Sequence, residues 1–133
     1  MPSRAQDWFR QAERDLEQAR ASHEQERHEW ACFAAQQAAG KAIKAVHLAQ
    51  GQEAWGHMAA RLLGELPIEV EESLISRAQV LDNFYIPARY PDSHPEGAPF
   101  EHFGSLQSQN ALDHADAILE FARTEVADAD GGS

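Results

Sequence analysis

The 133-residue chain has a single cysteine, Cys32, so it has no second thiol with which to form an internal disulfide. We interpret Cys32 as a small buried side chain in a reducing compartment, and we expect the protein in the cytoplasm. The chain also lacks an apolar run long enough to cross a bilayer, and its first residues, MPSRAQDWFRQAERD, lack the apolar core of a secretion signal. We therefore expect no membrane association.

Positive charge is scarce, because 11 lysine and arginine residues face 22 aspartate and glutamate residues and give a formal net charge of −11. Nucleic acids attract proteins mainly through lysine and arginine, so this balance argues against broad nucleic-acid binding. A small nucleotide, a locally basic groove or a basic protein partner remains compatible with it. The charges are spread along the predicted helices, which is also the pattern of an ordinary solvated acidic surface.

The common site motifs are missing. No HExxH, CxxC or similar ligand spacing is present, and the acid–histidine neighbours Asp113–His114 and Glu101–His102 would point in different directions on a helix. The chain also has no glycine-rich phosphate loop and no GxSxG nucleophile turn. We therefore expect no metal and no cofactor, and kinase functions, Rossmann-type functions and hydrolases of the GxSxG type have no support.

The sequence does contain strong helical periodicity, with apolar residues at three- and four-residue steps. Four long segments share this pattern: residues 4–22, 29–50, 68–84 and 105–127. A short helix fits residues 56–66, and no strand pattern or internal repeat is visible. The sequence thus predicts an all-α, up-and-down bundle of four long helices plus one short helix. We place this domain at residues 1–127 and a flexible tail at 128–133.

The segment at residues 29–50 is expected to be the central helix. A seven-residue rhythm of small residues would let its neighbours approach closely: Cys32, Ala35, Ala39, Ala42, Val46 and Ala49. The adjoining face begins with Trp30 and Phe33 and then becomes polar at Gln37, Lys41 and Lys44, which we call the polar stripe. Gly40 is unfavourable within a helix and points to close backbone packing at this position.

The most distinctive segment is the loop at residues 81–97, LDNFYIPARYPDSHPEG. It places Tyr85, Arg89, Tyr90 and His94 among three prolines, whose fixed backbone dihedrals stiffen the chain. Part of any functional site is expected here.

Several segments, taken in order, resemble the HEPN domain family over nearly the whole chain. They are AERDLEQA at 12–19, HEWACFAAQQAAGKAIKAVHLAQG at 28–51, the glycine–histidine pair at 56–57 and LDNFYIPARYPD at 81–92. The combination of QQAA-x-KA-x-KA with a downstream YIPxRYPD is specific, and it resembles one subgroup of the family. The family pattern usually has glutamate where this chain has Gly40.

The resemblance implies a helical bundle that forms homodimers and works with a minimal nucleotidyltransferase encoded beside it. It also implies nucleotide binding, for which we expect a groove formed by Gln37, Lys41, Lys44, Tyr85, Arg89 and Tyr90. An adenine-sized ring between the two tyrosines and Trp30 would be physically sensible.

Simpler roles remain open for each of these residues. Arg89 could form a salt bridge with a helix carboxylate or cap helix carbonyls. The two lysines could be ordinary solvated side chains, and the tyrosines could anchor the loop. The dimer could also serve only to buffer its partner without binding a small ligand.

Many family members cleave RNA without a metal, with an arginine and a histidine a few residues later that come from both subunits of a dimer. Arg89 and His94 fit that spacing, although Pro91 and Pro95 argue against a regular helix through the motif. A histidine can take a proton from a ribose 2′-hydroxyl while an arginine stabilises charge on the phosphate. The alternative function is therefore a toxin-type, metal-independent ribonuclease that uses Arg89 and His94 across a dimer interface.

Overall fold

The computed structural model describes residues 3–131, and this part of the chain contains helices and loops but no strand. The helices are α1 (Ala5–Glu24), α2 (His28–Ala49), α3 (Ala59–Gly64), α4 (Glu72–Asp82), α5 (Pro99–His102) and α6 (Ser105–Gly131), together with a 3-10 turn at Pro91–Ser93. The predicted all-α bundle is confirmed. Between residues 3 and 131, none of these helices is both long enough and apolar enough to cross a membrane.

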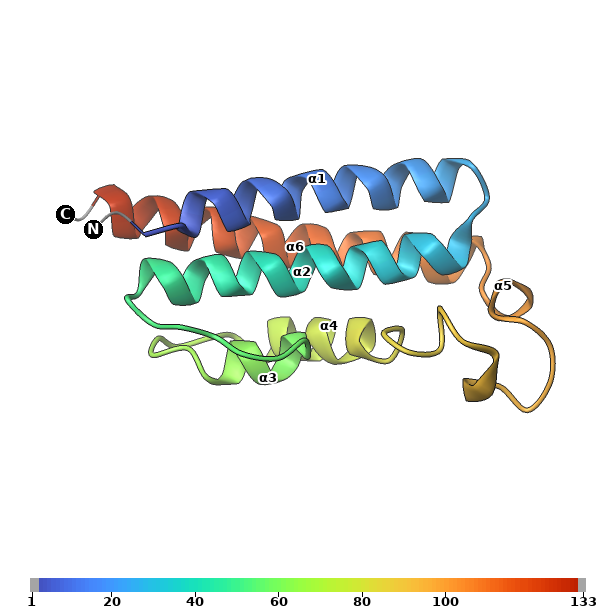
Figure 1. Cartoon of the computed structure of the whole chain (residues 1–133). Helices are drawn as coiled ribbons and strands as arrows, with labels where there is room; N and C mark the ends of the chain where they lie inside the picture. The colour runs from blue at the N-terminus through green and yellow to red at the C-terminus, as the bar shows by residue number, and fades with distance from the viewer. Residues whose placement is uncertain (1–2, 132–133) are drawn as a thin grey trace.

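The three longest helices, α1, α2 and α6, lie side by side, and the pair α3 and α4 packs beside α2 and α6 (Figure 1). Helix α2 contacts each of the other five α-helices, so it is the central helix, as its sequence predicts. The loop after α4, helix α5 and the turn between α1 and α2 lie at one end of the bundle (Figure 1). That end therefore brings together segments that are far apart in the sequence.

The long helices pack through faces of small residues. Fully covered alanines on these faces include Ala12, Ala19, Ala35, Ala39, Ala42, Ala115 and Ala122. Larger side chains, among them Ile43, Leu81 and Ile118, fill the remaining core. The inward faces that periodicity predicts are largely confirmed, and the predicted inward residues that are only half-buried are Trp8, Ala49, Val70, Leu74 and Tyr85.

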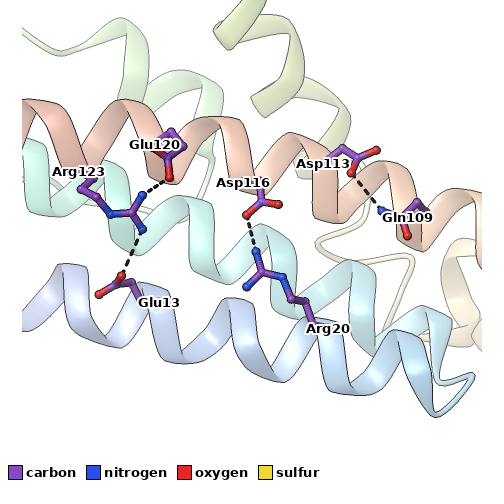
Figure 2. A network of polar contacts seen from close by, with 7 residues as sticks. All are labelled: Glu13, Arg20, Gln109, Asp113, Asp116, Glu120 and Arg123. Atoms are coloured by element: carbon purple, nitrogen blue, oxygen red, sulfur yellow. Dashed lines mark hydrogen bonds and ion pairs between the residues drawn. The ribbon is translucent and has the colours of Figure 1, made fainter.

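The outer edges of α1 and α6 are joined by ion pairs (Figure 2). Arg20 contacts Asp116 with an N–O distance of 2.5 Å, and Arg123 pairs with both Glu13 and Glu120. Because these side chains are well exposed, each pair contributes at most about 1 kcal/mol to stability. The pairs occupy two of the chain's few arginines, which leaves fewer cations available for a ligand.

Helix α4 is shorter than predicted and spans Glu72–Asp82 rather than residues 68–84. Its end has a local cause, because the residue before a proline is disfavoured in the helical region and Ile86 precedes Pro87. The chain therefore continues as turns after α4. Helix α3 is likewise shorter than predicted, and α5, a single turn of four residues, was not predicted.

Helix α6 continues to Gly131, four residues beyond its predicted end. Residues 128–130 contain no proline or glycine to stop the helix before that point. The last two residues of the predicted tail, 132–133, and the first two of the predicted domain lie outside the described residues.

The one cysteine is buried, as predicted. Cys32 is 0 % exposed in α2, and burial raises the pKa of its thiol to about 12, with the charge of Glu29 contributing to the shift. Since the thiolate is the reactive form, this thiol is inert in the folded protein.

Candidate functional site

Arg89 is held against three aromatic rings at one end of the bundle. Its guanidinium carbon lies 4.5 Å from the ring centroids of Phe33 and Tyr85 and 5.0 Å from that of Tyr90. Its Nε donates a hydrogen bond of 2.8 Å to the carbonyl of Tyr85. Within residues 3–131 it forms no ion pair, so the guanidinium is fixed in place but its charge is not neutralised by a carboxylate.

Backbone hydrogen bonds beyond the end of α4 form single turns, and these turns hold the loop that carries Arg89 in place. The N–H of Ala88 donates to the carbonyl of Phe84, and the N–H groups of Arg89 and Tyr90 both donate to the carbonyl of Ile86. The Ala88 side chain is buried and anchors the loop to the bundle. The result is a short, rigid connection that returns Arg89 to the surface of α2.

The polar stripe begins at Gln37, one helical turn after Phe33, the residue of α2 whose ring contacts Arg89. Phe33 and Gln37 are four residues apart on α2, so they lie on one side of that helix. The side chain of Gln37 donates through Nε2 to Oε1 of Gln36 at 2.9 Å. The structure thus places the Arg89 loop and the polar stripe on the same side of the central helix.

The two lysines of the stripe have different surroundings. Lys41 forms an ion pair with Asp15 of α1, with an N–O distance of 2.5 Å. Lys44 forms no ion pair with any described residue, and its Nζ lies 5.4 Å from the ring centroid of Trp8. Burial lowers the pKa of Lys44, and the neighbouring charge of Lys41 lowers it further. Lys44 is therefore the lysine whose charge lacks a counterion.

A small cavity of about 140 Å³ lies against this stripe, and we call it the Lys44 hollow. It is lined by Trp8, Gln36, Gln37, Gly40, Lys41, Lys44, Gly56 and His57. The ring of His57 stacks on Tyr85, with centroids 5.6 Å apart and an interplanar angle of 16°. Because Tyr85 also contacts Arg89, one wall of the hollow adjoins the aromatic rings around the guanidinium.

Trp8 and Lys41 also line a wider groove of about 690 Å³ beside the N-terminal part of α1. Arg4, Arg10 and Asp7 line the same groove, and Asp7 pairs with both arginines. The sequence alone did not predict this groove. The spacing of these residues within α1 gives no sign that Lys41 of α2 lies beside them.

Buried polar contacts hold the His57 segment against α2. Asp82 accepts hydrogen bonds from the N–H groups of Ala59 at 2.8 Å and Ala60 at 3.0 Å, so it caps the first turn of α3 from the end of α4. Fully buried Gln36 donates to Asp82 at 3.1 Å and to the carbonyl of His57 at 2.7 Å. This network fixes the wall of the hollow.

Neither Gln36 nor Asp82 was singled out from the sequence. One feature of the sequence does point to Gln36, because it is a polar residue within an alanine-rich helix, next to Gln37. Its burial depends on α3 and α4, which residue spacing alone does not place.

His94 is oriented by the backbone and does not bond to Arg89. Its Nε2 donates to the carbonyl of Pro87 at 2.7 Å, which leaves Nδ1 as the acceptor nitrogen of the neutral ring. The ring stacks on His102, with centroids 4.2 Å apart. Among the described residues no hydrogen bond joins His94 to Arg89, and a 3-10 turn at Pro91–Ser93 separates them.

The expected stacking site for an adenine ring differs from what the structure contains. The guanidinium of Arg89 lies over both Tyr85 and Tyr90, so it covers ring surface that was expected to receive the base. Trp30 contacts Phe33 edge to face at 6.0 Å and remains 51 % exposed. In the described part of the chain, no cluster of three or more His, Cys, Asp or Glu side chains could hold a metal ion.

The fold and the site together define a small all-α bundle with an unneutralised arginine and a lysine-lined hollow on one side of its central helix. The HEPN domain model matches residues 5–125, and the chain belongs to the HEPN domain family. None of the curated proteins matches the chain.

Solved structures support the same family. The chain is similar to TT1696 from Thermus thermophilus, with 48 % identity and a TM-score of 0.91 over 93 % of this chain and 99 % of that one. It is similar to ST0689, an archaeal HEPN homologue, with 36 % identity and a TM-score of 0.81 over 95 % and 99 %. A HEPN domain protein from Thermotoga maritima, tm0613, has 33 % identity and a TM-score of 0.72 over 89 % and 95 %.

Proposed function

We propose that this HEPN domain is a nucleotide-binding and interaction module. The observation that carries the proposal is Arg89, whose guanidinium is held by three rings and a backbone carbonyl and has no carboxylate partner within residues 3–131. A fixed, planar guanidinium suits the oxygens of a phosphate. In a chain of net charge −11, this half-buried positive site is a local exception that favours an anionic ligand.

The positions of the other proposed binding residues support them to different degrees. Lys44 and Gln37 line the hollow directly, and Tyr85 and Tyr90 hold Arg89 in place. Lys41 would have to exchange its ion pair with Asp15 for a ligand contact.

Calorimetric titration of ATP and GTP tests the proposal. Arg89→Ala is expected to weaken binding by about tenfold or more, because a charge-assisted hydrogen bond to phosphate is lost. Arg14→Ala is the matched control, since Arg14 is exposed on α1 and, among residues 3–131, its ion pair is with its neighbour Glu17. This control should keep the affinity within about twofold. Equal affinity in Arg89→Ala, or no binding by the unaltered protein, would contradict the proposal.

We also propose that the domain forms a homodimer and works with a minimal nucleotidyltransferase. The support is a set of exposed large apolar side chains on the start of α2, the loop after α4, α5 and the start of α6: Trp30, Ile86, Tyr90, Phe100 and Leu106. These segments lie at the same end of the bundle (Figure 1). Exposed apolar surface of this kind favours a protein interface.

A toxin-type ribonuclease is the second candidate, and the orientation of His94 favours it. The Pro87 carbonyl accepts a hydrogen bond from Nε2–H, so in the neutral imidazole Nδ1 is the nitrogen that can accept a proton. No hydrogen bond joins Arg89 to His94 among the described residues, so in this candidate function they act together through a phosphate, which two protomers could share.

His94→Ala separates the two functions. With EDTA present to exclude metal-dependent contaminants, the binding-module proposal expects that RNA is left intact by the unaltered protein and by the variant. Cleavage that disappears in His94→Ala while light scattering shows the same oligomer would instead establish the ribonuclease.

A further inference from the structure

Gly40 lines the Lys44 hollow, yet packing does not require a glycine there. An added Cβ would have only the carbonyl oxygen of His57 within 4 Å, at 4.0 Å, which is an ordinary contact. Gly40 is buried and a backbone carbonyl does lie beside it, but the contact is loose enough to admit a Cβ. Glycine is a poor helix former, so it does not stabilise α2 at this position. The main local effect of Gly40 is the space that its missing side chain leaves beside Lys44.

The volume of the hollow suits one small group rather than a whole ligand. Its volume is about 140 Å³, whereas a water molecule in the liquid takes roughly 30 Å³ and pockets for drug-sized molecules measure about 300–1,000 Å³. Among the described residues that line it there are two lysines and no carboxylate. The chemistry of the wall favours an anion.

Lys44 is the cation available to that anion. Lys41 already has Asp15 as its partner, whereas Lys44 lies over the Trp8 ring without an ion pair in the described part of the chain. Partial burial and the charge of Lys41 both lower the pKa of Lys44, so its ammonium group would be stabilised by a bound anion.

We infer that the Lys44 hollow is a subsite for one phosphoryl group, which Lys44 contacts and which the missing side chain at Gly40 admits. This inference rests on the proposed nucleotide binding and specifies the class of ligand. The hollow adjoins the His57–Tyr85 stack, and Tyr85 contacts Arg89. A nucleotide that places one phosphoryl group in the hollow and another against Arg89 needs at least two of them, so ATP should bind more tightly than AMP.

A pair of substitutions at Gly40 tests the inference. Gly40→Glu places a carboxylate one turn before Lys44, where a glutamate–lysine pair is favourable, and fills the hollow. We expect it to weaken binding of ATP and of inorganic pyrophosphate by about tenfold or more and to abolish the preference for ATP over AMP. Gly40→Ala should keep the affinity within about twofold and raise the denaturation midpoint, because alanine is the better helix former.

Gln79→Glu controls for the change in net charge, since Gln79 is exposed on α4 and does not line the hollow. This variant should bind like the unaltered protein. If Gly40→Glu fails to fold, Lys44→Met replaces it, because methionine keeps an apolar stem over Trp8 and removes the charge.

The outcomes separate this inference from the proposed function. Loss of pyrophosphate binding in Gly40→Glu, but not in Gly40→Ala or Gln79→Glu, supports the subsite. If ATP binding depends on Arg89 but is unchanged in Gly40→Glu, the subsite is wrong and the proposed function stands. If pyrophosphate binding depends on Gly40 while ATP affinity is indifferent to Arg89→Ala, the subsite stands and the nucleotide proposal fails. If pyrophosphate does not bind at all, the subsite is wrong.

Discussion

Replacing Ile43 with alanine is expected to lower the free energy of unfolding by about 3–4 kcal/mol. Ile43 is 0 % exposed and lies on α2, the helix that contacts all five other α-helices. The substitution removes three buried carbon atoms and leaves a cavity, because helices packed through alanine faces have little freedom to collapse around it. Urea denaturation followed by circular dichroism measures the loss.

Ile43→Val is the matched control, since it removes a single methylene group. It should cost about 1 kcal/mol. If Ile43→Ala costs no more than this control, the central position of α2 in the core is wrong. A small protein of one domain should also show coincident transitions by far-ultraviolet dichroism and by tryptophan fluorescence.

Asp82→Ala is expected to lower the free energy of unfolding by about 2–4 kcal/mol, as a sum of two effects. Loss of the cap on α3 costs about 1 kcal/mol, and leaving the buried amide of Gln36 without this acceptor adds roughly 1–3 kcal/mol. The structural basis is the set of three hydrogen bonds that Asp82 accepts from Gln36, Ala59 and Ala60. Chemical denaturation gives the magnitude.

Two further variants test whether Asp82 stabilises the protein through its hydrogen bonds and together with Gln36. Asp82→Asn keeps one oxygen acceptor and should lose only about half as much stability as Asp82→Ala. In a double-mutant cycle with Gln36→Leu, the two positions should be coupled by about 0.5–3 kcal/mol. Strict additivity would show that the two side chains do not act as one network.

The helices could be predicted from the sequence because each has an apolar face with a helical repeat. Most alanines of α2, although not Ala34 or Ala49, and the inward residues of α6 are buried where the repeat places them. Helix α4 was predicted too long at both ends, at 68–71 and at 83–84; at its C-terminal end the apolar repeat continues through residues 84–85, although the proline at position 87 ends helical structure earlier. Periodicity reports which face is apolar, whereas local backbone chemistry decides where a helix stops.

The candidate site was predictable only in part. The prolines and aromatic residues identified the Arg89 loop, and residue spacing identified the polar stripe. The partners of Arg89 could not be deduced, because its contact with Phe33 joins residues 56 positions apart in the chain. The same holds for the Gln36–Asp82 network and for the stacking of His94 on His102, which depend on how α3, α4 and α5 pack.

A crystal structure of the protein with bound ATP tests the central claim most directly, namely that Arg89 and Lys44 serve one anionic ligand on the same side of α2. We expect phosphate oxygens within hydrogen-bond distance of the Arg89 guanidinium and of the Lys44 ammonium group, with the Arg89 ring contacts unchanged. ATP bound elsewhere, or Arg89 paired with a carboxylate of a second protomer, would contradict the account.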